Sequence, residues 1–215
     1  MSAGESTATP VRPAPRRRSN RAQVSTAYLL TCAAIGVAGG IVLAAGWWVS
    51  SMLFIAVPLV SVAIAGLWLM PAVIALRLIQ RPLAGLLVGL ISGLVLAPFF
   101  TIGAIGTTLW WAFFAELAFI LVLYRLWNRW LHYAAALIVG VVYPIMAAAS
   151  FDLWTIPLGM QIAYFAITLA SCFAGTWLGI LIADRLRKAG VAKLARRRGL
   201  ASRGLGRGAG PAGQH

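Results

Sequence analysis

The sequence predicts an all-α membrane protein, built as a bundle of six transmembrane helices with both termini in the cytoplasm. Apolar residues make up 61% of the 215-residue chain and charged residues only 10%, whereas about a quarter of the residues in a soluble domain are charged. The mean hydropathy is +0.90. Between two basic termini, apolar stretches follow one another with short interruptions, and each approaches the roughly 20 residues that a helix needs to cross a bilayer.

The apolar stretches define the predicted helices in order along the chain. The second stretch contains Pro58 and Pro71 within one long apolar run, the third is rich in glycine and alanine, and the fourth carries two adjacent tryptophans. Residues 48–57 are expected to include an outer loop that folds back over the helices. The six predicted spans are residues 27–47, 57–79, 82–100, 108–126, 132–150 and 161–183.

The 18 Lys and Arg residues support six spans. With the N-terminus in the cytoplasm, all 18 fall on cytoplasmic segments: five before the first span, two at each of two turns, and nine after the last span. The three outer loops contain none, so an odd number of spans would place the basic C-terminal segment outside and break the positive-inside rule. The basic residues at the two turns are Arg77, Arg81, Arg125 and Arg129.

The two termini divide the chain into three parts. Residues 1–26 are rich in Pro, Ser and Arg and are predicted to form a disordered basic arm, and residues 185–215 a disordered basic tail. Residues 27–184 form the predicted transmembrane domain. A nucleic-acid role for such segments exists in principle, but contact with anionic lipid at the cytoplasmic surface is favoured.

The chain lacks the motifs of common enzymes and metal sites. Neither of its two lysines follows a glycine, so no phosphate-binding loop of the G-x-x-x-x-G-K-[ST] type exists. His132 is the only histidine besides the terminal His215, which is too few for a metal centre. Cys32 and Cys172 lie within spans and are expected to be inert buried thiols. The sequence therefore predicts neither an enzyme nor a resident cofactor.

Glu116 is the acidic residue that points most directly to a ligand. It lies in the segment WWAFFAELAFILVLY, about eight residues and roughly 12 Å from the outer end of its predicted span. A carboxylate at that depth costs about 2.5 kcal/mol or more unless it faces a cavity or a partner. Because no Lys or Arg lies on that side of the membrane, we expect a cationic ligand. A protonated Glu116 bonded between helices is the alternative.

Aromatic residues gather in the outer half around this carboxylate. Trp68 and Tyr143 lie well inside their spans, and aromatic faces beside an acid suit a flat heteroaromatic cation. Asp152 is either a ligand contact at the outer surface or an exposed loop carboxylate. Four tryptophans fit an interfacial belt, namely Trp47, Trp48, Trp110 and Trp111. Candidate pocket residues near the outer end also include Trp154, Gln161 and Tyr164, of which the last two share a helical face.

Small residues recur at four-residue spacing in the first span. Such a smooth stripe allows another helix to approach closely. It either packs within the bundle or serves as a docking face for another membrane protein, and the sequence leaves both open. The main stripe is Cys32, Gly36, Gly40 and Ala44, and Ala34 and Ala38 form a second pair on a neighbouring face.

One block of the sequence resembles a known family. The segment GLWLMPAVIALRLIQRPLAGLLVGLISGLV is similar to the second and third helices of YkoE-like substrate-binding (S) subunits of energy-coupling factor (ECF) transporters. The shared pattern is G-[IL]-W, an apolar helix, an [IL]-x-[RK]-P turn and a Gly/Ala-rich helix. The segments FAELAF and SFDLW and a closing helix that ends in AD-x-L extend the resemblance over residues 27–195.

The resemblance implies a vitamin-uptake function in the cell membrane. Such a subunit would capture thiamine or its hydroxymethylpyrimidine precursor from outside. It would work with a membrane coupling subunit, docked on the stripe in the first span, and with two ATPase subunits of this type of ABC transporter. By motif, the resemblance implies that Trp68, Glu116 and Asp152 bind substrate. A self-contained carrier for a cationic heterocycle, or a membrane assembly factor that binds no small molecule, are the alternatives.

Overall fold

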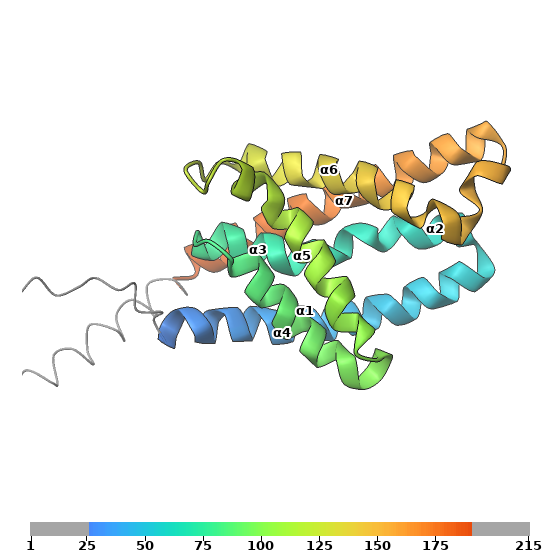
Figure 1. Cartoon of the computed structure of the whole chain (residues 1–215). Coiled ribbons are helices and arrows are strands. Elements are labelled where there is room, and N and C mark those ends of the chain that lie inside the picture. The colour runs from blue at the N-terminus through green and yellow to red at the C-terminus, as the bar shows by residue number, and fades with distance from the viewer. Residues whose placement is uncertain (1–25, 191–215) are drawn as a thin grey trace, which may run out of the picture.

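The computed structural model describes residues 26–190, and this part of the chain is helical without any β-strand (Figure 1). Successive helices run back and forth along one bundle, with α4 and α5 inclined across the others (Figure 1). The elements are α1 (Thr26–Ala56), α2 (Pro58–Ser61), η1 (Val62–Trp68), α3 (Met70–Ile79), α4 (Ala84–Phe100), α5 (Gly103–Leu121), α6 (Arg129–Ala147), η2 (Ala148–Phe151), η3 (Leu153–Thr155) and α7 (Leu158–Lys188), where η denotes a 3₁₀-helix.

Within residues 26–190, five helical stretches are long and apolar enough to cross a membrane: α1, η1 with α3, α5, α6 and α7. The apolar helix α4 has 17 residues, which gives a length of about 25 Å against a hydrocarbon core of roughly 30 Å. The all-helical membrane fold is thus confirmed. A sixth crossing, formed by α4, stays a prediction.

The charge distribution divides the bundle into two ends. The start of α1, the end of α7 and the α3–α4 and α5–α6 turns lie together at one end (Figure 1). All Lys and Arg residues between positions 26 and 190 lie in these segments or in the helix turns that adjoin them, so we call this the basic end and the opposite one the far end. The positive-inside rule predicts a cytoplasmic basic end. The basic-end residues are Arg77, Arg81, Arg125, Arg129, Arg185, Arg187 and Lys188.

Several predicted boundaries are wrong. The expected loop at 48–57 is helical as far as Ala56, because no residue of that segment interrupts a helix before the extended Val57 (φ −146°) and Pro58. The fourth span begins at Gly103 rather than at 108, directly after a tight turn at Thr101 (φ 90°). The helix α7 continues to Lys188, so the predicted tail begins too early. Residues 1–25 of the predicted arm 1–26 and residues 191–215 of the predicted tail lie outside the described residues.

The main glycine stripe of α1 packs inside the bundle. A Cβ atom at Gly36 would lie 2.7 Å from the side chain of Ile91, and one at Gly40 would lie 2.7 Å from that of Val95. Both partners are on α4, and the Ser92 hydroxyl of that helix donates a hydrogen bond of 2.9 Å to the Gly36 carbonyl. The stripe thus provides internal helix packing. Its use as an external docking face, as the sequence allowed for Gly36 and Gly40, is wrong.

The neighbouring small-residue face of α1 has the opposite environment. Ala34 and Ala38 are exposed on the outside of the bundle, as is Val37 between them. Ala44, at the end of the main stripe, is half-buried. Of the two small-residue faces of α1, the Ala34–Ala38 face is therefore the one that is exposed to another membrane helix.

Candidate functional site

Glu116 caps the N-terminus of another helix. Its side chain is fully buried on α5 (0% exposed). One carboxylate oxygen accepts the backbone N–H of Leu83 at 2.5 Å, and the other accepts that of Leu86 at 2.9 Å. Leu83 is the N-cap residue of α4 and supplies no side-chain cap. Glu116 thus satisfies N–H groups that an α-helix leaves unpaired in its first turn, where the helix dipole favours a negative charge.

The predicted depth and pairing of Glu116 are wrong. It lies five residues before the end of α5 at Leu121, or about 8 Å from the basic-end terminus of that helix. It also has three partners within the chain, since the Tyr124 hydroxyl donates a further hydrogen bond at 2.8 Å. The sequence could not show this, because the N–H groups come from a turn 30 to 33 residues away.

The same carboxylate holds both turns of the basic end. Residues Gln80 and Leu83 of the α3–α4 turn have positive φ, as have Leu123 and Tyr124 of the α5–α6 turn, and a left-handed backbone is costly for such residues. Burial and the hydrogen bond to Glu116 raise the pKa of Tyr124 to about 12. Tyr124 therefore keeps its proton and stays a donor to the carboxylate at physiological pH.

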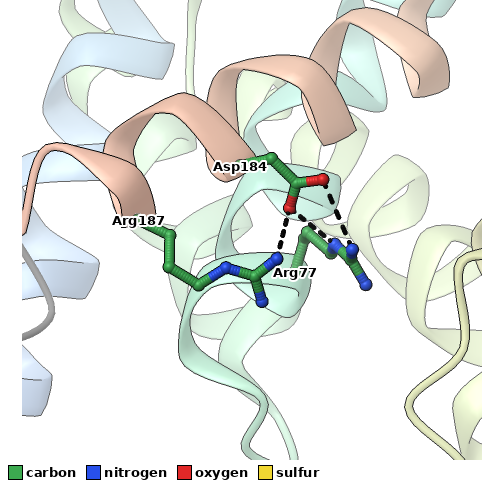
Figure 2. Close-up of polar contacts among 3 residues, drawn as sticks. All are labelled: Arg77, Asp184 and Arg187. Carbon is green, nitrogen blue, oxygen red and sulfur yellow. Dashed lines mark hydrogen bonds and ion pairs between the residues drawn. The ribbon is translucent and has the colours of Figure 1, made fainter.

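Asp184 joins two helices at the same end. Its carboxylate accepts hydrogen bonds from Nε of Arg77 at 3.0 Å and from Nη2 of Arg77 at 3.3 Å (Figure 2). A third bond of 2.7 Å comes from Arg187, one turn further along α7. Two of the four acids of the chain thus serve the structure of the basic end, and neither faces the far-end aromatic residues.

Two groups of aromatic rings lie in the far half of the bundle. In the first, Trp68 meets Trp47 edge to face with ring centroids 5.5 Å apart, and Trp47 stacks on Phe100 at 4.8 Å. In the second, the ring of Tyr143 lies 4.8 Å from that of Trp111. Trp68 and Tyr143 pack against one buried cluster, which includes Trp111. We call these five residues, together with Trp110, the aromatic region.

The interfacial-belt interpretation was wrong for part of this region. Trp111 is only 3% exposed and Trp47 is half-buried, whereas Trp48 is 59% exposed as a belt residue should be. Sequence reasoning missed Trp47, Trp111 and Phe100 as candidate site residues. Their position near helix ends resembles a belt, and only the packing of α1, α4 and α5 turns them inward.

The other predicted substrate residues lie in different parts of the bundle. Tyr164 is fully buried in a neighbouring cluster against which Tyr143 also packs. Asp152 and Trp154 are exposed at the far end, where Asp152 adopts a left-handed conformation (φ 46°) between η2 and η3. Gln161 donates to the carbonyl of Ile156 at 2.9 Å.

Gln161 also faces a groove on the surface of the bundle. It lines a shallow groove of about 430 Å³ between α6 and α7, together with apolar side chains such as Phe165 and Leu169. Of the seven predicted substrate residues, Trp68 and Tyr143 pack against one buried cluster, and Tyr143 also packs against the cluster that contains Tyr164. Asp152 and Trp154 lie at the far end. Gln161 lies in the groove, and Glu116 lies at the basic end.

Metal-ligating side chains are scattered in residues 26–190. No three His, Cys, Asp or Glu side chains lie close enough there to hold one ion. Cys32 and Cys172 are buried free thiols, as predicted, on α1 and α7. His132 is also buried, with its ring 4.8 Å from that of Phe119.

Comparisons with known proteins place the chain in a transporter family. The sequence model of the family described as "ABC-type cobalt transport system, permease component" matches residues 28–142. No curated protein matches the sequence significantly. A solved structure described as "Crystal structure of an S-component of ECF transporter" superposes with a TM-score of 0.69 at 19% identity, covering 83% of this chain and 97% of that one.

The structural match shows the fold of the chain, and the sequence match shows its family. The fold is that of an ECF transporter S-component. The match over more than half of its length shows that the chain belongs to the family of ABC-type cobalt transport system permease components.

Proposed function

We propose that the protein is the S-component of an ECF transporter, and that it captures thiamine or hydroxymethylpyrimidine at the far end for uptake energised by partner subunits. The transporter family and the S-component fold support the class of function. The aromatic region supports the type of substrate, and it is the single observation on which the choice of substrate rests.

The aromatic region has the chemistry that thiamine requires. Thiamine carries a flat aminopyrimidine and a thiazolium cation. Indole and phenol faces attract such rings by stacking and by cation–π contact, worth about 0.5–2 kcal/mol for each well-placed pair. Trp68 and Tyr143, on different helices but packed on one cluster, would then contact the two sides of one ligand.

Asp152 is the proposed charge partner of the substrate. It is the one acid at the far end of residues 26–190, since Glu116 and Asp184 both lie at the basic end. Asp tolerates the left-handed conformation that this turn requires. Thr155 stabilises the turn by donating its N–H and its hydroxyl to the Asp152 carbonyl, at 2.9 and 2.7 Å. Trp154, next to it, would cover the bound ligand.

The coupling subunit is proposed to dock on the Ala34–Ala38 face of α1. Both alanines are exposed, and small residues four apart let a second membrane helix approach closely. The chain has no phosphate-binding loop of its own, so ATP hydrolysis is assigned to two ATPase subunits. The ATPases would meet the complex in the cytoplasm, on the side of the basic end.

Intrinsic tryptophan fluorescence tests the proposed substrate. Detergent-purified protein is titrated with thiamine and with hydroxymethylpyrimidine, in wild type, in Trp68→Phe and in the control Trp177→Phe. Trp177 is 55% exposed on α7, outside the aromatic region. Saturable quenching that Trp68→Phe weakens at least tenfold and Trp177→Phe leaves unchanged is expected. No quenching by either ligand in folded protein would overturn the choice of substrate.

Cobalt is the second candidate substrate, because the family description names it. Side-chain capture of Co²⁺ needs several nitrogen, oxygen or sulfur ligands around one point, and no three His, Cys, Asp or Glu side chains gather within residues 26–190. A parallel titration with Co²⁺ distinguishes the candidates. Saturable Co²⁺ binding that thiamine does not compete with would favour the metal.

A further inference from the structure

The second membrane-crossing stretch has an unusual local structure. Between the short α2 and α3, it contains the 3₁₀-helix η1, which runs for seven residues from Val62 to Trp68. Runs of 3₁₀-helix longer than three or four residues are uncommon, because their hydrogen-bond geometry is poorer than that of an α-helix. This helix ends on Trp68, the residue proposed above to contact the substrate, so whatever holds η1 also sets the position of that indole.

A serine on α7 is inserted into η1. The Ser171 hydroxyl donates a hydrogen bond of 2.6 Å to the Ala63 carbonyl and accepts one of 2.9 Å from the Gly66 N–H. These two backbone groups are three residues apart, which is the pair that a 3₁₀-helix joins directly. Insertion of a side chain into the hydrogen-bond ladder bends a helix. Ser171 thus determines the local path of η1 from a position 105 residues away.

The backbones of η1 and α7 also touch near Ser171. A Cβ atom at Gly66 would collide with the backbone carbonyl of Ser171, and one at Gly175 would collide with the backbone of Gly66. Glycine is required at both positions, since a side chain would push the two helices apart. The contact fixes η1 against α7 just two residues before Trp68, whose ring then meets Trp47.

We propose that Ser171 is a positioning residue of the substrate site, which acts through η1 on the indole of Trp68. The inference rests on the proposed function, because it assigns Ser171 a role in binding the same aromatic ligand. Without the hydroxyl, the Ala63 carbonyl and the Gly66 N–H can bond to each other directly. The path of η1 then changes, and Trp68 shifts relative to its neighbours while most of the fold is kept.

The test compares Ser171→Ala with a matched control. Ser92→Ala also removes a serine hydroxyl that bonds a backbone carbonyl across two helices, at 2.9 Å to Gly36, and that hydrogen bond joins α4 to α1 and does not involve η1. Thiamine affinity and thermal stability are measured for both. The emission of Trp68 in ligand-free protein is obtained as the difference between each protein and its Trp68→Phe counterpart. Ser171→Thr, which keeps the hydroxyl, is the conservative variant.

The expected result separates positioning from stability. Ser171→Ala removes the two hydrogen bonds of the hydroxyl to η1. It is therefore expected to weaken thiamine binding by roughly tenfold and to shift the emission of Trp68. Ser171→Thr binds within about threefold of wild type, and Ser92→Ala leaves affinity and Trp68 emission unchanged. If Ser171→Ala does not fold, Ser171→Cys fills the volume with a weakly bonding thiol and gives the same comparison.

Three outcomes would overturn the inference. One is wild-type affinity and unchanged Trp68 emission in Ser171→Ala. Another is an equal loss of affinity in Ser92→Ala, which would show a general effect of destabilisation. The third is an unshifted Trp68 emission alongside weakened binding. Absence of thiamine binding in wild type would instead overturn the proposed function, while the ligand-free emission of Trp68 would still report whether Ser171 positions it.

Discussion

Replacing Glu116 by glutamine distinguishes a structural carboxylate from a substrate ligand. The carboxylate accepts two backbone N–H groups of the α4 N-terminus on different oxygens, and the Tyr124 hydroxyl as well. Glutamine has one acceptor oxygen and one NH₂ group. In either orientation of the amide, the NH₂ group faces the N–H of Leu83 or that of Leu86. One buried N–H therefore loses its acceptor.

The magnitude follows from these contacts. A buried N–H without a partner costs about 1–3 kcal/mol, and the loss of negative charge at the start of α4 adds about 0.5–2 kcal/mol. Taking about 3 kcal/mol in all, the melting temperature should fall by about 6–12 °C for a chain of this size. Tyr124→Phe removes only the third hydrogen bond, so its effect should be about half as large.

The assay is thermal unfolding in detergent, paired with thiamine titration of the same proteins. Glu116→Gln should melt several degrees below wild type and bind thiamine with an affinity within about threefold of it, since the carboxylate lies at the basic end. The reverse result would refute the reasoning: an unchanged melting temperature with loss of thiamine binding would return Glu116 to the substrate site.

Two further predictions concern helix contacts. Gly175→Ala places a Cβ against the backbone of η1 and should prevent recovery of folded monomer in size-exclusion chromatography, whereas Gly106→Ala, with open space around the new Cβ, should elute as wild type. A wild-type profile for Gly175→Ala would contradict the close contact. Ala38→Leu roughens the exposed face of α1 and should abolish co-purification with the coupling subunit while leaving thiamine affinity intact. Undisturbed co-purification would place the docking face elsewhere.

Much of the fold could be predicted from one-dimensional patterns. The apolar stretches predicted helices that the structure contains in the same order, with shifts of three to five residues at several ends. The largest shift is at the end of α1, which continues to Ala56 instead of ending at 47. The start of α5 moves from 108 to Gly103, because Thr101 turns the chain tightly just before it. The placement of Trp68 and Tyr143 within the bundle was also predictable, since both lie well inside apolar stretches.

The candidate site was less predictable, because its chemistry depends on distant partners. Glu116 was conspicuous as an acid in an apolar helix, but its function depends on two N–H groups of another helix. Ser171 was visible only as one polar residue on a helix face, and nothing local indicates that it bridges η1. The glycines of α1 could have served inside or outside the bundle until α4 was found against them.

The sequence by itself determined the class of the protein: a helical membrane protein whose basic residues are predicted to lie on one side of the membrane, without a phosphate-binding loop motif. These properties depend on composition and order along the chain, through the cost of apolar surface in water and of charge in lipid. Only the tertiary structure decided which carboxylate is a cap, which tryptophans turn inward and which face of α1 remains free. Those outcomes depend on contacts between residues far apart in sequence, and contact geometry arises only once the helices have packed.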